Sequence, residues 1–129
     1  MKAASKARYL CSELVKVEWR DKAGAYHTHA ILEEIWAEGA SVQTLHPIRT
    51  GARVWIVARR AMLLGILTEC RPAEDGHFSQ ISFDAESRWS QRKYKPEHMV
   101  STHAVLVHWL KRNLAQTETP RVRAAGDSA

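Results

Sequence analysis

Histidines are among the side chains of this sequence that could ligate a metal ion, and two of them lie close enough in the sequence to share one. His27 and His29 are two residues apart, so on a β-strand both would project from one face and could ligate the same metal ion. A zinc site needs three or four ligands, and the sequence places no third one beside this pair. We therefore expect no metal site and predict that the histidines face solvent.

Nucleophilic and acid–base catalysis are not indicated either. Cys11 and Cys70 belong to no C-x-x-C pair and have no neighbouring activating motif, so we expect packed, unreactive thiols. Glu33 and Glu34 are sequence neighbours that would point to opposite faces of a strand. The sequence contains no G-x-S-x-G, H-E-x-x-H or phosphate-loop pattern. We predict a protein that is not an enzyme.

The composition fits one globular domain. The chain has 129 residues, is 45% hydrophobic and 26% charged, and carries a net charge of +5 with a pI near 9.5. This small positive excess mildly favours anionic partners. No stretch approaches the ~18 apolar residues of a membrane span, and residues 1–10 lack the apolar segment of a secretory signal. We expect a cytoplasmic protein without membrane contact.

Alternating apolar and polar residues predict six short strands. They lie at residues 14–20, 26–35, 40–45, 53–59, 62–70 and 77–83. Because closure removes exposed sheet edges, strands of this length and spacing predict a mainly β fold with a closed antiparallel barrel over residues 13–85. Trp19 is predicted in the core. Trp55 is predicted on an outer face, either beneath a helix or in a patch for a partner.

A different pattern follows the predicted barrel, in residues 86–116. Trp89 and Tyr94 are predicted to pack back on the barrel as part of an aromatic linker. Apolar residues then recur at helical spacing, at Val100, Ala104, Val107, Leu110 and Leu114. They predict an amphipathic helix of about four turns, with Ser101 or Thr102 as its cap.

The ends of the chain and the packing of the helix complete the expected organisation. The helix is the natural cover for Trp55. Residues 1–12 are predicted to form a flexible N-terminal segment with a partial arginine motif, and residues 117–129 are predicted to be disordered because they lack periodicity.

The order of these elements, with two motifs, resembles a PilZ domain over about residues 5–85. The family carries an R-x-x-x-R motif just before its first barrel strand and a D/N-x-S-x-x-G motif at the end of the second strand. Arg8 stands at the second arginine position, and residues 30–40, with Gly39 at the glycine position, align with the second motif. The resemblance implies a six-stranded antiparallel PilZ-like β-barrel.

PilZ domains characteristically bind cyclic di-GMP, so the resemblance implies a nucleotide site at Arg8, Glu34, Trp36 and Gly39. The family's arginines contact guanine edges and phosphates, which suits a planar guanidinium. Glu34 and Trp36 stand where the family has aspartate and serine. Trp36 would either stack on a guanine or cover the end of the barrel, and Arg8 would either grip an anion or neutralise Glu34.

Two further departures from the family pattern are Ala4, at the first arginine position, and Gln80, where the closing strand often carries glycine. The loss of one arginine and one serine contact would cost about 3–6 kcal/mol, on the order of 10²- to 10⁴-fold in affinity. The sequence therefore predicts weak or lost nucleotide binding.

Three functions follow as expectations. The first is a non-catalytic signalling module in bacterial cyclic di-GMP pathways, an adaptor that recruits a protein partner. The second is a functional cyclic di-GMP receptor that uses Arg8, Glu34 and Gly39. The third is a small-barrel single-stranded nucleic-acid binder, which five tryptophans and a positive charge permit. The aromatic residues are not interleaved with Lys and Arg on one face, which argues against nucleic acid.

Overall fold

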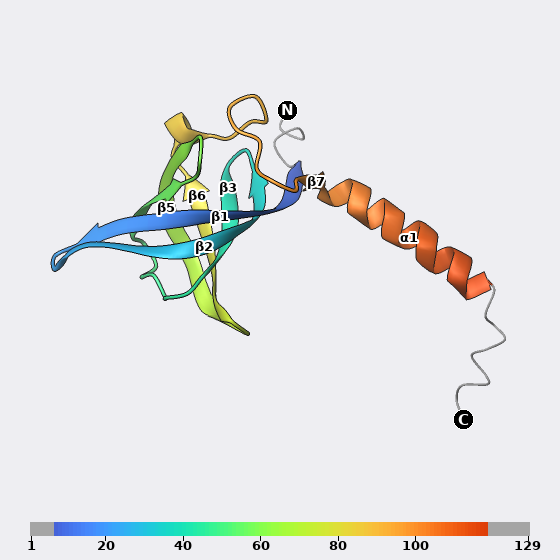
Figure 1. Ribbon diagram of the computed structural model, residues 1–129, viewed down its shortest axis with the longest axis horizontal. Helices are drawn as coiled ribbons and strands as arrows, with labels where there is room; N and C mark the ends of the chain where they lie inside the picture. Colours follow the sequence, from blue (N-terminus) through green and yellow to red (C-terminus); the bar gives the residue numbers. More distant parts are fainter. Residues whose placement is uncertain (1–6, 119–129) are drawn as a thin grey trace.

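The computed structural model describes residues 7–118, with side chains described as far as residue 113. Along this part of the chain the elements are β1 (Arg8–Asp21), β2 (Gly24–Trp36), β3 (Gly39–Thr44), β4 (Arg53–Val57), β5 (Met62–Ala73), β6 (Gly76–Phe83), a short 3-10 helix η2 (Ala85–Ser87), β7 (Val100–Ser101) and α1 (Thr102–Glu118). The strands form one sheet in the order β2-β3-β6-β5-β4-β1-β7, and β1 also pairs with β2. That pairing closes a six-stranded antiparallel barrel (Figure 1). The predicted mainly β fold, a closed barrel followed by a helix, is confirmed.

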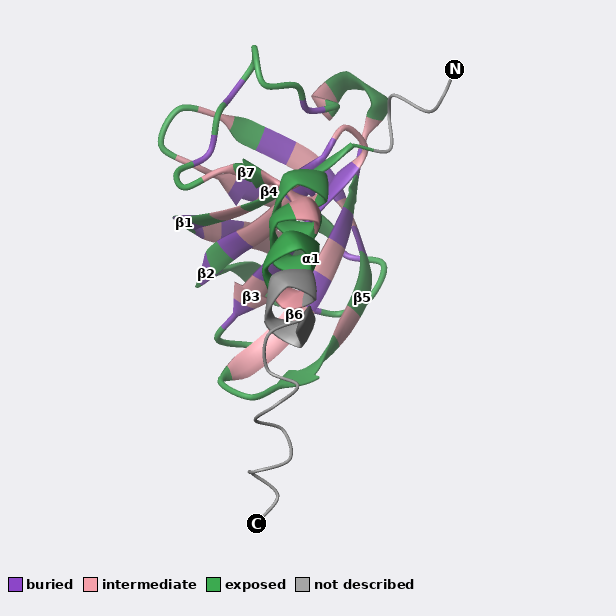
Figure 2. Ribbon diagram, turned by 90° about the vertical axis from the view of Figure 1, so that its right-hand side faces the viewer, coloured by how far each residue is buried: buried purple, intermediate pink, exposed green. Residues whose placement is uncertain are grey.

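The hydrophobic core lies inside the barrel. Its largest fully buried apolar side chains are Leu32, Ile35, Ile56, Leu63, Leu67 and Ile81. Each such side chain contributes about 1.5–3 kcal/mol relative to an exposed one. Figure 2 shows buried residues on the barrel strands, whereas α1 presents exposed and intermediate residues where it is described. The barrel therefore builds its core without the helix.

Strand β1 begins at Arg8 rather than at residue 14. The alternation of apolar and polar residues did not predict this start, because burial and polarity disagree in this part of the strand. Glu13 faces the interior and is 6% exposed, whereas Leu14 faces outward and is 71% exposed. The buried carboxylate of Glu13 accepts a hydrogen bond from the backbone N–H of Glu97 at 2.9 Å, which offsets the cost of removing it from water. Residues 8–12, predicted within a flexible N-terminal segment, are part of β1. Residues 1–6 and 119–129 lie outside the described residues.

A β-bulge in β2 changes which residues face the interior. The register of β2 against β3 shifts between Leu32 and Glu34. Leu32 is buried before the bulge and Ile35 after it, so the inward parity changes from even to odd residue numbers. Glu34 and Trp36 consequently project from the outer face of the barrel.

The linker after β6 covers one end of the barrel. Trp89 and Tyr94 are buried there, as predicted. The Trp89 backbone N–H donates to the Ala37 carbonyl at 2.9 Å, and its indole N–H donates to the Tyr94 carbonyl at 2.7 Å. The Trp89 ring also packs edge-on against Tyr9, with 5.6 Å between centroids. These contacts tie the linker to β1 and to the β2–β3 turn.

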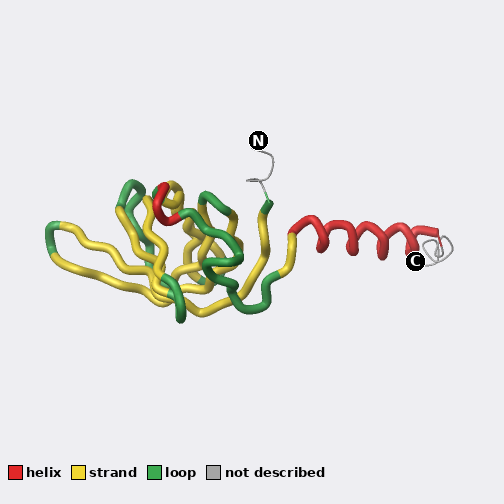
Figure 3. Tube along the Cα trace, turned by 90° about the horizontal axis from the view of Figure 1, so that it is seen from above, coloured by secondary structure: helices red, strands yellow, loops and turns green. Residues whose placement is uncertain are grey.

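Helix α1 is anchored at its first turn only and then projects from the barrel (Figures 1 and 3). Strand β7 pairs with β1 through Ser101 and Tyr9. The Ser101 hydroxyl oxygen accepts a hydrogen bond from the Ala104 N–H at 3.3 Å, so Ser101 is the N-terminal cap. The Thr102 hydroxyl donates to the Arg8 carbonyl at 3.0 Å. The start of β1 and the start of α1 are thus joined beside the barrel.

The prediction that the helix covers Trp55 is wrong. Helix α1 makes its main contacts with β1 and β7, whereas Trp55 lies on β4 and lines an open cleft. The helix starts where β7 pairs with the N-terminal end of β1 and leads away from there, so it does not lie over β4. The helix also runs on to Glu118, so residues 117 and 118, which were predicted to be disordered, belong to it.

Matched isoleucine substitutions test the assignment of strand faces. Ile56 is 0% exposed and Ile31 is 41% exposed. We expect Ile56→Ala to lower the free energy of unfolding by about 2–5 kcal/mol, because it leaves a cavity in the barrel. Ile31→Ala should cost less than about 1 kcal/mol, which is the span of strand propensities. Urea denaturation measures both, and equal losses would contradict the assignment.

Candidate functional site

Strand register brings the four predicted site residues together. Arg8 on β1 pairs with Trp36 on β2, and Trp36 pairs with Gly39 on β3. Residues opposite each other on neighbouring strands project from the same face. Glu34 lies two residues before Trp36 on that outer face. We call these four residues the Arg8 cluster.

The charge of Arg8 is already partnered within the Arg8 cluster. Its guanidinium carbon lies 3.8 Å from the centroid of the Trp36 ring. A guanidinium nitrogen lies 3.5 Å from a Glu34 carboxylate oxygen, with side-chain exposures of 44% for Arg8 and 23% for Glu34. A cation–π contact contributes about 0.5–1 kcal/mol at an exposed site, and a surface ion pair about 0–1 kcal/mol. Of the two roles considered for Arg8, the ion pair with Glu34 is therefore present.

Gly39 is fixed by close packing rather than by backbone conformation. A Cβ at this position would lie 2.4 Å from the Ile81 carbonyl oxygen and 3.0 Å from the Trp36 ring. The glycine thus lets the indole lie across β3 while β6 approaches from the other side. Trp36 is 7% exposed as a result, and a base stacking on the ring face that Arg8 covers would have to replace the guanidinium.

The β2–β3 turn beside the Arg8 cluster is bonded to the rest of the protein. The Glu38 carbonyl accepts from the Phe83 N–H at 2.7 Å, and the Ala37 carbonyl accepts from the Trp89 N–H at 2.9 Å. Both of these carbonyl oxygens already accept a hydrogen bond, and a carbonyl oxygen does not attract an anion. The turn therefore connects β2 and β3 to β6 and to the linker through backbone hydrogen bonds.

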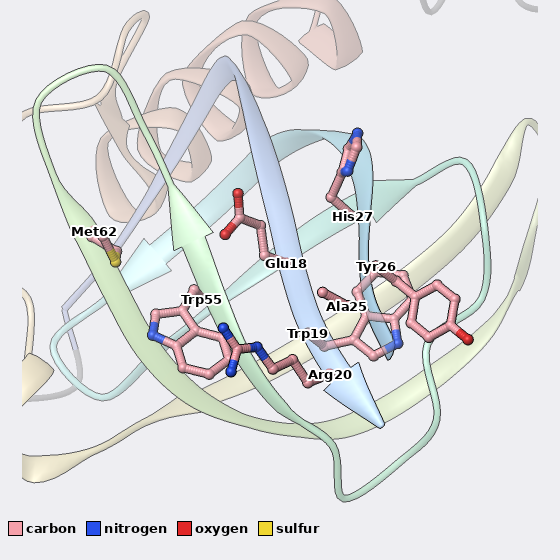
Figure 4. Close-up of a pocket in the computed structure, with 8 residues that line it drawn as sticks. All are labelled: Glu18, Trp19, Arg20, Ala25, Tyr26, His27, Trp55 and Met62. Atoms are coloured by element: carbon pink, nitrogen blue, oxygen red, sulfur yellow. The ribbon is translucent and has the colours of Figure 1, made fainter. Parts of the chain in front are cut away.

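Sequence reasoning missed an aromatic cleft at the far end of β1 (Figure 4). It has a volume of about 450 Å³ and is lined by Glu18, Trp19, Arg20, Ala25, Tyr26, His27, Trp55 and Met62. The Trp19 and Tyr26 rings stack at 5.8 Å, and Figure 4 shows Arg20 reaching from β1 toward Trp55. Trp19, predicted in the core, packs against it but is only partly buried. The outward position of Trp55 was the one sequence signal for this cleft.

The histidine pair lies on the outer face of β2. His27 and His29 are exposed, and their rings meet edge-on with 6.1 Å between centroids. Among the described residues, no group of three or more His, Cys, Asp or Glu side chains could hold a metal ion.

Cys11 lies in a partly buried position of β1, close to three glutamate carboxylates. Its thiol donates to the Leu32 carbonyl at 3.7 Å. Burial, reinforced by the negative charges of Glu13, Glu34 and Glu33, raises the pKa of Cys11 to about 12. The thiol therefore stays protonated at neutral pH, which is unfavourable for a nucleophile.

Comparison with known proteins gives no relative from which a role could be transferred. No family model, curated protein or solved structure matches the chain. None of the helices in the described part of the chain is long and apolar enough to cross a membrane.

A double-mutant cycle tests the contact between Arg8 and Trp36. We expect Arg8→Ala and Trp36→Leu to be non-additive by about 0.5–1 kcal/mol in the free energy of unfolding, because either change removes the same cation–π contact. The control cycle pairs Arg20→Ala with Trp36→Leu and should be additive. Additive losses for Arg8 and Trp36 would show that the contact does not stabilise the fold.

Alkylation by iodoacetamide tests the raised pKa of Cys11 in the Cys70→Ser background. A pKa of about 12 instead of 9.0 lowers the thiolate fraction roughly a thousandfold at pH 8. The more basic thiolate is more nucleophilic, so we expect native protein to react at least about thirtyfold more slowly than protein in urea. Its rate should rise about tenfold per pH unit up to pH 10. Equal native and denatured rates would contradict this expectation.

Proposed function

We propose that this protein is a non-catalytic, PilZ-like module that acts as an adaptor in bacterial cyclic di-GMP signalling, with weak or lost nucleotide binding. The closed six-stranded barrel is the architecture that the resemblance implied, and it supports the proposal at the level of the fold. The adaptor function would use surfaces of the folded protein to hold a partner.

The observation that carries this proposal is the use of Arg8 within the protein. A nucleotide clamp needs a guanidinium free to meet guanine edges and phosphates. Arg8 instead lies on the Trp36 ring at 3.8 Å and faces Glu34 at 3.5 Å. A nucleotide would have to displace the first contact and compete with a carboxylate for the second. Both costs add to those of the missing arginine and serine contacts.

The side chains of the projecting helix favour a protein as the partner. Its exposed large apolar side chains are Val105, Leu106, Trp109 and Leu110, which are 41–56% exposed. Most of the stability of helices in proteins comes from the packing of their apolar face, and an uncovered apolar stripe is typical of an interaction surface. Lys111 and Arg112 are exposed on the same helix. They favour a partner whose apolar groove has an acidic rim.

Each alternative function has one supporting observation. The receptor alternative is supported by the meeting of all four predicted site residues in the Arg8 cluster. The nucleic-acid alternative is supported by the aromatic cleft, which Trp19, Tyr26 and Trp55 line together with Arg20. Base stacking there would quench tryptophan fluorescence, whereas charge attraction alone would leave it unchanged.

Isothermal titration calorimetry with cyclic di-GMP tests the proposal on the full chain. We expect no saturable binding in the low micromolar range, because a loss of about 3–6 kcal/mol moves a micromolar site toward millimolar. Arg8→Ala is the matched variant and should give the same flat titration. Saturable low-micromolar binding that Arg8→Ala abolishes would establish the receptor and overturn the adaptor.

A further inference from the structure

A second cleft lies between the β4–β5 turn and the linker after β6, away from the Arg8 cluster. It has a volume of about 390 Å³, which is in the range of small-molecule sites. Its cations come from two segments. They are Arg59 and Arg60 in the turn and Arg92, Lys93 and Lys95 in the linker. We call it the cationic cleft.

The positive charge of this cleft is not balanced from within. Glu13 and Glu97 also line it. Glu97 pairs with Arg59 at 3.6 Å, and the Glu13 carboxylate is buried against the Glu97 N–H. Within the described part of the chain, the other four cations of the cleft have no carboxylate within the 4.0 Å that defines an ion pair. Like charges held together in this way lower the energy of a bound anion.

Tyr94 is the aromatic residue in the wall of the cationic cleft, and it brings no charge of its own. Tyr94 is 7% exposed. Burial and the neighbouring Glu13 carboxylate raise the pKa of Tyr94, so the hydroxyl keeps its proton. The charge that an anion would meet in this cleft is therefore set by the arginine and lysine side chains.

Both segments that carry the cations are fixed by backbone hydrogen bonds. The β4–β5 turn is closed by the Ala58 N–H, which donates to the Ala61 carbonyl at 2.8 Å. In the linker, the N–H groups of Lys93 and Tyr94 donate to the Ser90 carbonyl at 3.0 and 3.2 Å. Positioning the charges before a ligand arrives lowers the entropic cost of binding.

From these observations we infer that the cationic cleft binds the di- or triphosphate group of a small molecule. Arg60, Arg92 and Lys95 have no carboxylate partner, and the Lys93 ammonium group donates to the Arg88 carbonyl. This set of charges matches an anion that carries several charges on a compact group, and arginine meets phosphate oxygens in a two-pronged contact. Tyr94 is the aromatic residue that lines the cleft, and it is buried, so no base-stacking surface accompanies the charges. This favours a small phosphate compound over single-stranded nucleic acid. The inference does not rest on the adaptor function.

Calorimetry of the full chain with inorganic tripolyphosphate at 0.15 M salt tests the inference. We expect saturable binding of one tripolyphosphate per chain. The variant Arg60→Gln/Arg92→Gln should bind at least about tenfold more weakly, because it removes one cation from each segment of the cleft. The control Lys22→Gln/Arg49→Gln removes the same charge from exposed positions outside the cleft and should change affinity by less than about threefold. Thermal unfolding of both variants confirms that they are folded.

Three results would overturn the inference. The first is the absence of saturable binding to the wild-type chain. The second is an equal loss of affinity in both double variants, which would show attraction to the overall charge rather than to a site. The third is an oligothymidine that binds more tightly than tripolyphosphate and loses its binding in the Arg60→Gln/Arg92→Gln variant, which would assign the cleft to single-stranded nucleic acid.

Discussion

The rest of the structure depends on the pairing of one strand, β1, along both of its edges. On one edge β1 pairs with β2 over nearly its whole length, and on the other it pairs with β4 and then with β7. These pairings close the barrel and give β1 a partner strand on each side. The same strand supplies Arg8 to the Arg8 cluster, holds the start of the helix and ends at the aromatic cleft. The closure of the barrel, the Arg8 cluster, the base of the helix and the aromatic cleft therefore depend directly on the register of β1.

Most of the fold could be predicted from the sequence because each barrel strand has one apolar and one polar face. That signal fails where burial and polarity disagree. Glu13 is inside the barrel and Leu14 outside, so the N-terminal half of β1 carries no readable alternation. Strand β7 is two residues long, too short for any period. The helix was predictable from its spacing, but its direction was not, because direction is set by the pairing of β7 with β1.

The candidate site could be predicted as a set of residues but not as a geometry. The resemblance to the PilZ pattern predicted Arg8, Glu34, Trp36 and Gly39, and the strand register brings these four residues together. The bulge in β2 decides that Trp36 lies outside the barrel, and no sequence rule signals that bulge. The two clefts are built from residues far apart in the chain. Their charges and rings are visible in the sequence, whereas their convergence follows from the closed sheet.

The narrow attachment of α1 has a mechanical consequence. The helix has 17 residues, which corresponds to a rod about 25 Å long, and a tilt of about 10° at its base would move its tip by about 4 Å. Its base rests on a two-residue strand and on the bond from Thr102 to the carbonyl of Arg8, the residue whose side chain grips Trp36. A disturbance of that arginine would thus be amplified along a lever, and its effect would be largest at the distal turns.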